Sequence, residues 1–565
     1  MRLHRTPAPG RRPRRRLASI ATGSALGALT LGWVSGCSVI YDLSTEQCSA
    51  DADCSALGGA FTGLVCVENL CQEAPITGCQ SNAQCMDEQG NTFEPWACID
   101  RECVKLDTPE CPTMLPQTQE LWRTNLRSNN PLILAGTGVI SGTTVLDTRL
   151  RNYDLAITEL TNRNGGLPSG RQVVMLGCRA TFDDDEGLNR EMDHLANVVK
   201  VPGLISAFEA ADLQRAFNEY GLAAQMFFMS PLQSDPALAA LQDEGLIWHM
   251  GPASESIARV YAPLLTRTLA FLGVTTDAKV ATVVTTDDRL LADMLPTVET
   301  TPDRFGLAFN DKTVSQNRTD NNYRTVNVTS SASSDVSTQI SAIVTMRPHV
   351  IISVADTQFV QRMLPAIEAQ WPTDGTPKPF YLLSPDNFND ARVQDQVQSI
   401  SGLYQRVAGV NFAAAADTHV YDEYVGRWLG AFPDFPEDVN YENFYDAAYY
   451  LLYAAAGARQ NLTNGQSLLT GMNRLLAGPE YEVGPGQMPE AMGLVGQSNT
   501  NIELVGTLGP PDFNRTNGTR NAPGSVWCID SNRAFRADVL RYEAGAGDDA
   551  TQASLTGSFP CIADF

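Results

Sequence analysis

The chain has 565 residues, of which 43 % are hydrophobic and 18 % are charged, and its formal net charge is −24. This length predicts more than one folded unit, and the composition is that of a globular protein able to bury a core. The negative charge argues against binding to nucleic acid or to anionic lipid surfaces, because it offers nothing to neutralise phosphates. The simpler explanation of the charge is that an acidic surface keeps the protein soluble.

The first residues have the pattern of an export signal. Arginines at positions 11, 12, 14, 15 and 16 precede an apolar stretch of small residues, 17–34, that is short for a stable membrane span. The stretch ends Val-Ser-Gly-Cys at Cys37, which resembles the bacterial lipobox. We therefore expect residues 1–36 to be a lipoprotein signal peptide, Cys37 to carry the lipid and residues 37–47 to be a tether. The alternative is a plain signal peptide followed by an incidental cysteine.

The residue after Cys37 bears on the membrane. Ser38 replaces the aspartate that favours inner-membrane retention of such lipoproteins. We therefore expect an anchor in the outer membrane, with the protein facing the periplasm or the cell surface.

Eight of the twelve remaining cysteines form an internal repeat of about 31 residues. The cysteines of the first copy are separated by five, eleven and four residues, and those of the second by five, twelve and four. The first copy comprises Cys48, Cys54, Cys66 and Cys71, and the second Cys79, Cys85, Cys98 and Cys103. Units this small need cross-links in place of a core, so residues 48–112 predict a Cys-rich region.

Export makes disulfides the expected chemistry of these cysteines. Zinc is the competing interpretation, but the cysteine pairs are spaced by four and five residues and no histidine lies in the segment. The pairing within each repeat stays open at this point. Of the cysteines left over, we expect Cys111 to pair with Cys178 and Cys528 to pair with Cys561.

From about Pro131 onward, short apolar runs alternate with amphipathic stretches of helical length. Runs that predict strands occupy residues 131–138, 171–178, 203–208, 226–231, 278–286, 348–356 and 379–386. The predicted helices include residues 148–166, which Gly165 and Gly166 terminate, and residues 185–201. This alternation predicts an α/β fold with parallel sheets covered by helices, and such sheets place ligands beyond the carboxyl ends of their strands.

No catalytic or phosphate-binding motif accompanies these elements. The sequence has no Walker loop, no G-x-S-x-G and no H-E-x-x-H, and the turn after Gly136 lacks the full glycine pattern of a dinucleotide site. The five histidines are scattered. The acidic run 183–186 lacks calcium-loop spacing and adjoins a predicted helix start, where acids suit the helix dipole. We expect neither an enzyme nor a cofactor or metal centre.

Several segments, taken in order, resemble the type I periplasmic binding proteins, especially the group that binds leucine, isoleucine and valine. Residues 136–173 resemble that family's first loop, first helix and Gly-Gly…Gly-Arg turn. Further similar segments are FFMSPLQSDPAL at 227–238, the strand and helix at 347–369, the Tyr-Asp-Ala helix at 441–455 and the glycine-rich turn at 502–518. Their order and spacing make the resemblance more specific than any single segment does.

The resemblance implies two doubly wound αβ lobes joined by three chain crossings, preceded by the small disulfide-rich region. The family binds its ligand in a cleft that closes by hinge motion of the lobes. Residues 128–255 and 412–510 would form the first lobe, and residues 256–411 and 511–565 the second.

The resemblance also suggests residues for the first-lobe side of the cleft, where this family holds a carboxylate. Ser234 matches the family's hydroxyl donor, with Gln233 beside it. Glu209 or Ala210 occupies the place of a family serine that also donates to the carboxylate. This is a departure, because an alanine offers only its N–H and a glutamate repels a carboxylate. An ordinary α-amino acid ligand is therefore in doubt.

On the second lobe, Asp386 matches the acidic residue that pairs with a ligand ammonium. Asp287 or Arg289 lies in the loop where the family often has a tyrosine wall, and Asp356 ends the next strand. Capping of turns and helices is the structural alternative for Ser234 and Asp386.

The resemblance thus predicts a lipid-anchored extracytoplasmic protein that captures a small polar, amino-acid-like solute and passes it to an ABC-type permease. The alternative is an envelope receptor or protein-interaction lipoprotein that keeps the fold without transport and contacts another protein through its Cys-rich repeats.

Overall fold

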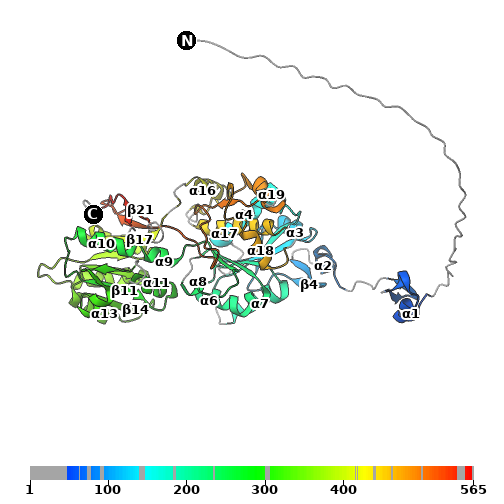
Figure 1. The fold of residues 1–565 in the computed structure, drawn as a ribbon, viewed down its shortest axis with the longest axis horizontal. Helices are drawn as coiled ribbons and strands as arrows, with labels where there is room; N and C mark the ends of the chain where they lie inside the picture. The colour runs from blue at the N-terminus through cyan, green and yellow to red at the C-terminus, as the bar shows by residue number, and fades with distance from the viewer. Residues whose placement is uncertain are drawn as a thin grey trace, which may run out of the picture. The chain divides into compact units, whose positions relative to one another are not determined.

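The computed structural model describes residues 47–565 apart from residues 63, 73–77, 90–93, 139–146, 182–185, 233–235, 300–305, 414, 416–417, 437–440, 460–461, 498–499, 544–553 and 563–564. The described chain divides into two units, which part between Thr77 and Gly78 (Figure 1). The expected signal peptide, Cys37 and all but the last residue of the tether lie outside the described residues. Among the helices that are described, none is long and apolar enough to span a bilayer.

The two cysteine repeats fold alike, each into a short helix followed by a two-stranded hairpin. The first contains α1 (Asp51–Ala56), the 3₁₀ turn η1 (Gly59–Phe61), β1 (Val65–Val67) and β2 (Leu70–Gln72). The second contains α2 (Asn82–Glu88), β3 (Trp96–Ile99) and β4 (Glu102–Lys105). Both hairpins are antiparallel, and in each the third cysteine lies opposite the fourth.

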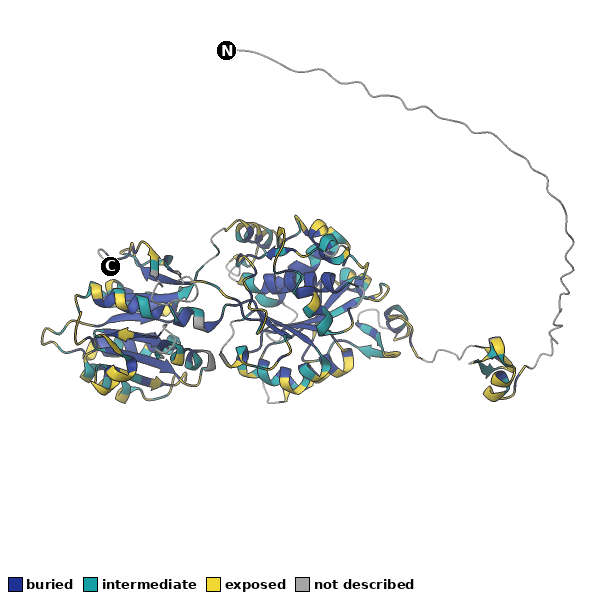
Figure 2. Ribbon diagram, in the orientation of Figure 1, coloured by how far each residue is buried: buried dark blue, intermediate teal, exposed yellow. Residues whose placement is uncertain are grey.

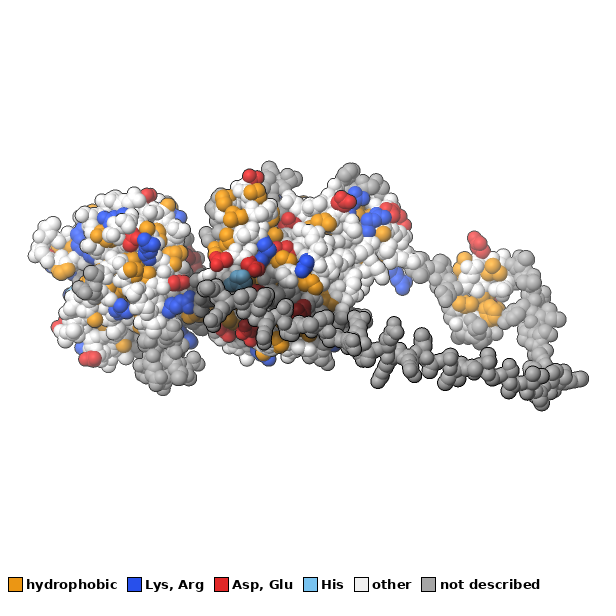
Figure 3. Space-filling model, turned by 90° about the horizontal axis from the view of Figure 1, so that it is seen from above, with side chains coloured by type: hydrophobic (Ala, Val, Ile, Leu, Met, Phe, Trp, Pro, Cys, Tyr) orange, Lys and Arg blue, Asp and Glu red, His pale blue; other side chains and the backbone are white. Residues whose placement is uncertain are grey.

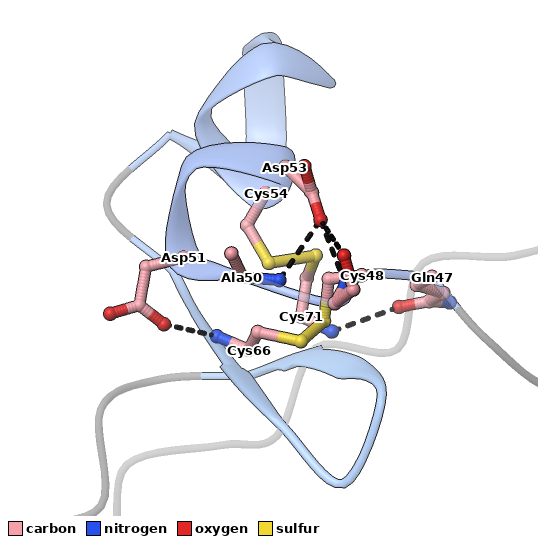
Figure 4. Close-up of a disulfide and its surroundings, with 9 residues drawn as sticks. Gln47, Cys48, Ala50, Asp51, Asp53, Cys54, Cys66 and Cys71 are labelled. Atoms are coloured by element: carbon pink, nitrogen blue, oxygen red, sulfur yellow. Dashed lines mark hydrogen bonds between the residues drawn. A yellow bond between two sulfur atoms is a disulfide. The ribbon is translucent and has the colours of Figure 1, made fainter.

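Disulfides in both repeats join the first cysteine to the third and the second to the fourth. The bonds are Cys48–Cys66 and Cys54–Cys71 in the first repeat (Figure 4) and Cys79–Cys98 and Cys85–Cys103 in the second. Equivalent side chains brace the hairpins. Asp51 Oδ1 accepts the N–H of Cys66 at 2.9 Å, and Asn82 Oδ1 accepts the N–H of Cys98 at 2.8 Å. The pairing that spacing left open is therefore the same in both copies.

The surroundings of the two repeats differ. In the first, the buried residues are Cys48, Cys54 and Cys71, with Phe61, Leu64 and Cys66 partly buried around them. In the second, Met86, Ala97 and Leu106 belong to the hydrophobic core of the first αβ lobe. The Arg127 guanidinium also holds both oxygens of Asp87, at 2.8 and 3.0 Å. The buried side chains of the first repeat are thus mainly disulfide cysteines, whereas the second repeat packs against the hydrophobic core of the first lobe.

The first lobe is built on a six-stranded sheet of order β10-β9-β8-β6-β7-β5. Its strands are β5 (Thr113–Leu115), β6 (Leu132–Gly138), β7 (Val173–Arg179), β8 (Gly203–Ile205), β9 (Phe227–Ser230) and β10 (Ile247–His249). All neighbours are parallel except β5, which runs antiparallel to β7. The Cys111–Cys178 disulfide, paired as predicted, ties the segment before β5 to β7.

Helices from two separate stretches of chain belong to this lobe. The first stretch provides α3 (Gln119–Leu126), α4 (Thr148–Asn164), α5 (Gly187–Asp193), η2 (His194–Val199), α6 (Ala210–Ala216), η3 (Phe217–Gly221), α7 (Leu222–Ala224) and α8 (Pro236–Ala239). The second provides α16 (His419–Ala431), α17 (Glu442–Ala458), α18 (Gly465–Met472) and α19 (Met488–Gln497), with the small parallel pair β18 (Glu480–Glu482) and β19 (Glu503–Val505). Helix α17 is buried from Phe444 to Ala458, because α4, α18 and α19 pack around it (Figure 2).

The second lobe is built on an eight-stranded sheet of order β14-β11-β15-β16-β17-β20-β21-β22. The strands are β11 (Val280–Thr285), β14 (Tyr323–Val328), β15 (Val350–Val354), β16 (Phe380–Leu383), β17 (Val407–Phe412), β20 (Gly524–Ile529), β21 (Phe535–Glu543) and β22 (Ser554–Gly557). The strands from β14 to β17 are parallel and the last three are antiparallel. The Cys528–Cys561 disulfide, also paired as predicted, fastens the end of the chain to β20.

The remaining elements accompany this second sheet. They are α9 (Ser254–Ala258), α10 (Tyr261–Phe271), α11 (Arg289–Glu299), the hairpin β12 (Ala308–Phe309) and β13 (Lys312–Thr313), α12 (Val314–Thr319), α13 (Ser337–Met346), η4 (Phe359–Met363), α14 (Leu364–Gln370), η5 (Pro385–Asn387), α15 (Ala391–Ser399) and η6 (Leu403–Arg406). Separate hydrophobic clusters, one containing Val280 and one containing Ile351, pack the two faces of the sheet.

The fold predicted from the sequence is confirmed: there are two αβ lobes, and the chain crosses between them three times. It leaves the first sheet after β10, returns after β17 and crosses again between β19 and β20. Glycines in the sequence also predicted where a helix ends. Helix α4 ends at Asn164, and Gly165 adopts φ 67°, the left-handed conformation that a glycine takes at a helix end.

One helix differs from its expected form. The predicted helix 185–201 is α5 followed by the π-helical η2, which ends before Lys200 at φ 59°. A wider π turn changes which side chains meet the sheet, and hydrophobic periodicity alone does not reveal it.

Candidate functional site

Carboxylates follow the parallel strands of the second sheet. Asp287 and Asp288 come after β11, Asp356 after β15 and Asp386 after β16. Because the carboxyl ends of parallel strands meet at one edge of a sheet, these side chains share an edge. This edge is where a doubly wound sheet receives its ligand, so the group is the candidate site on this lobe.

Asp386 is the most perturbed of these acids. Its side chain keeps an exposed surface, yet its pKa is raised to about 6, first because the surrounding protein desolvates the carboxyl. The neighbouring charges of Asp288, Asp356 and Glu209 raise the pKa further. A carboxyl that is open to water but crowded by protein and by other acids is suited to receive a cation.

Glu209 brings the first lobe into this group. It directly precedes α6, which follows β8, and its carboxylate forms no capping hydrogen bond with the helix. Its side chain is exposed, whereas Ala210, the first residue of α6, is half-buried. The effect of Glu209 on Asp386 shows that acids from the carboxyl ends of both sheets act on the same point.

Asp356 and Asp287 are partly engaged within the protein. Asp356 Oδ1 accepts the N–H of Gln358 at 3.1 Å, and desolvation raises the pKa of the carboxyl despite that bond. Asp287 accepts the N–H and the hydroxyl of Ser330, at 2.7 and 2.9 Å, and the first of these bonds lowers its pKa. Asp287 therefore braces the end of β14 while adding negative charge beside Asp356.

The predicted carboxylate-binding pair Gln233 and Ser234 lies outside the described residues. The structure does fix where that segment begins. The Asn443 side chain, at the start of α17, donates from Nδ2 to the carbonyl of Pro231 at 2.9 Å. The segment therefore starts at the carboxyl end of β9, beside the N-terminus of α17.

Sequence reasoning missed Asp288. Its Oδ1 accepts the N–H of Leu291 at 3.1 Å at the start of α11, and its charge raises the pKa of both Asp356 and Asp386. The signal was present, because the acid directly follows a buried strand. The resemblance indicates its neighbours Asp287 or Arg289 instead, because a loop has no periodicity that fixes a position to the residue.

Side chains that could together bind a metal lie close to one another at three places among the described residues. These side chains are cysteines of the disulfides, with Glu191 beside Cys111 and Cys178. Charged groups are interspersed among uncharged ones on the face that Figure 3 shows. The acids after β11, β15 and β16 therefore remain the candidate binding site.

No family model and no curated protein matches this sequence. Among solved structures, a leucine-binding protein from Thermotoga maritima is 11 % identical, with a TM-score of 0.48 over 72 % of this chain and 97 % of that chain. A fatty acid ABC transporter substrate-binding protein from Thermomonospora curvata is 14 % identical, with a TM-score of 0.49 over 76 % and 97 %. A branched-chain amino acid transporter substrate-binding protein from Streptococcus pneumoniae, in complex with isoleucine, is 10 % identical, with a TM-score of 0.49 over 76 % and 99 %. These solved structures belong to the class that the sequence resembles.

Proposed function

We propose that this chain is an extracytoplasmic solute-binding protein that captures a small polar solute bearing a cationic group between its two lobes. The observation that carries the proposal is the raised pKa of Asp386, to which acids of both lobes contribute. The charges of Asp288, Asp356 and Glu209 repel the Asp386 carboxylate. An ammonium among them relieves that repulsion and also bridges the lobes, which favours the closed form.

Asp386 would pair with the ammonium, with Glu209, Asp356 and Asp288 adding negative charge around it. Ser234, Gln233 and the N–H of Ala210 would bind polar groups of the solute on the first-lobe side. We propose delivery to an ABC-type permease, since binding alone changes no bond and needs a membrane partner to move the solute.

The test is a screen of metabolites by thermal shift on the purified protein, followed by calorimetry. A solute that binds only the folded state raises the melting temperature, and above Kd the rise grows with the logarithm of the solute concentration. We expect the hits to carry an amine or guanidine. A screen in which only anions or neutral solutes bind would contradict the proposal.

The affinity for such a cationic solute should depend on pH through Asp386. Since the pKa is about 6 in the empty protein, the carboxyl is charged above pH 6 and becomes protonated below it. We expect the affinity to fall below pH 6, by up to about tenfold for each pH unit, because the solute must displace a proton. Calorimetry from pH 5 to pH 8 measures this, and the Asp386→Asn variant should bind weakly with a flatter pH profile.

The same substitution, which weakens binding, should stabilise the protein in the absence of solute. A pKa raised by folding means that the charged form is disfavoured in the native state, so its cost is present above pH 6 and fades as the pH falls. Asp386→Asn should therefore raise the melting temperature of the unliganded protein at pH 8. A lower melting temperature would show that Asp386 supports the fold rather than the site.

We also propose that a lipid on Cys37 anchors the protein to a membrane. Replacing Cys37 by alanine removes the thiol that would carry the lipid, so the protein should move from the membrane fraction to the soluble fraction. Fractionation followed by immunoblotting measures this. A Ser38→Ala variant serves as the control, and a Cys37→Ala protein that still sediments with membranes would refute the anchor.

A further inference from the structure

Arg149 lies at the carboxyl end of a first-lobe strand and is not among the residues assigned to the site. It is the second residue of α4, and the N-terminus of that helix packs on the end of β6. A Cβ placed on Gly138, the last residue of β6, would lie 2.8 Å from Leu150 Cγ and 3.5 Å from Arg149 Cβ. The side chain of Arg149 therefore starts at the edge of the sheet where ligands bind in this architecture.

The guanidinium of Arg149 has no acidic partner within the described part of the chain. It lies 5.7 Å from the ring centroid of Phe444, near the start of α17, and the side chain is half-buried. Contact with an aromatic face orients a guanidinium without using its N–H donors. A half-buried guanidinium without an acidic partner among the described residues stands out in a chain of net charge −24, because acids are abundant enough to pair with it.

Hydrogen bonds connect the position of Arg149 to that of Glu209. Thr137, the residue before Gly138, accepts from Tyr153 of α4 through its carbonyl, at 3.1 Å. Its hydroxyl oxygen accepts the N–H of Ala207 at 2.7 Å, and Ala207 leads to Glu209. Strands β6 and β8 are neighbours, so Arg149 and Glu209 occupy adjacent strand ends.

These positions constrain where the anionic group of a solute can lie. An ammonium paired with Asp386 also lies in the field of Glu209, because the charge of Glu209 acts on the Asp386 carboxyl. A carboxylate attached one carbon from that ammonium would be held close to Glu209 and repelled by it. A carboxylate separated from the ammonium by several carbons can leave the acids and reach a cation elsewhere on the edge.

Resting on the proposed function, we infer that Arg149 binds the anionic group of the solute, and that the solute is an ω-amino acid type of zwitterion with separated charges. The acids after β11, β15 and β16 hold its ammonium, and the bidentate guanidinium holds its carboxylate. Arg149 thus supplies the attraction that Glu209 and Ala210 do not. It is a specificity-determining residue.

The experiment is calorimetry with a series of probes on the full protein at pH 7.5. The probes are glycine, β-alanine, 4-aminobutyrate, 5-aminopentanoate and 6-aminohexanoate, each beside the n-alkylamine of the same chain length. We expect the longer amino acids to bind more tightly than glycine and about 10- to 100-fold more tightly than their amines, the range for a charge-assisted hydrogen bond. Arg149→Gln should abolish the difference between acid and amine, and Arg149→Lys should retain part of it.

Arg163→Gln is the matched control, because Arg163 lies near the other end of α4 and is exposed. Arg163→Gln should bind each longer amino acid more tightly than its amine, by the same factor as the unsubstituted protein. Melting temperatures show whether the Arg149 variants fold. If Arg149→Gln does not fold, the ratio of acid to amine affinity is measured on Arg149→Lys.

If the probes bind, either of two results would overturn the inference while leaving the proposed function standing. One is tightest binding of glycine, and the other is an unchanged ratio of acid to amine in Arg149→Gln. If no probe binds but the metabolite screen yields an amine, the inference again falls alone. If the screen yields no cationic solute either, both fall.

Discussion

Replacing Cys54 and Cys71 by serine is expected to unfold residues 47–72 completely while leaving the larger unit folded. Among the described residues of this repeat the buried ones are three cysteines, so little apolar core supports them when a bond is lost. The Cys54–Cys71 bond closes a loop with a sequence separation of 17, and such a bond contributes about 3 kcal/mol. A segment this short has no comparable stabilising interaction to replace it.

The second repeat provides the matched comparison. Cys85→Ser with Cys103→Ser removes the equivalent bond, but Met86, Ala97 and Leu106 stay packed in the core of the first lobe. We expect partial order in that repeat. Hydrogen exchange followed by mass spectrometry measures both variants, with protection lost over residues 47–72 in the first and reduced over residues 79–105 in the second. Full protection of residues 47–72 in the Cys54/Cys71 variant would contradict the argument.

The Asp446→Ala substitution is expected to destabilise the larger unit by about 3 to 5 kcal/mol, the cost of breaking a buried charged network. Asp446 is completely buried on α17. Its Oδ1 accepts the N–H of Thr507 at 3.0 Å and its Oδ2 the N–H of Leu508 at 3.1 Å. Removing the carboxylate leaves two N–H groups without acceptors, and each unsatisfied buried group costs about 1–3 kcal/mol.

The consequence reaches the third crossing, which begins just beyond these two residues. Arg520 donates from Nη2 to the carbonyls of Leu508 and Pro510, at 2.7 and 3.0 Å, so its charge loses a nearby counter-charge when Asp446 is removed. Urea unfolding at pH 7 measures the free energy of unfolding by linear extrapolation. Asp422→Ala on α16 is the control, because Asp422 is exposed and its loss should cost less than about 0.5 kcal/mol. If Asp446→Ala lowers the free energy of unfolding by less than about 1 kcal/mol, other contacts hold the third crossing in place.

The positions of the acids in the candidate site follow from the sequence, whereas their effects on one another do not. Asp386 and Asp356 were found because each directly follows a buried strand, and chain order then places both at one sheet edge. That Glu209 acts on Asp386 could not be predicted, since the two residues are far apart in the chain and belong to different sheets. Arg149 was overlooked for the same reason: nothing local distinguishes it from the other arginines of α4.

The sequence by itself determined the αβ alternation, the element ends marked by glycine and the internal cysteine repeat, because these depend on periodicity and spacing along the chain. The tertiary structure decided which cysteines pair within a repeat. It also decided that disulfide cysteines form the buried part of the first repeat, whereas the second repeat packs into the hydrophobic core of the first lobe. It further decided that carboxylates from both sheets act on Asp386, and that a guanidinium at the adjacent strand end of the first sheet has no acidic partner among the described residues. These properties depend on distances through space, which strand order and the three crossings set and local sequence does not encode.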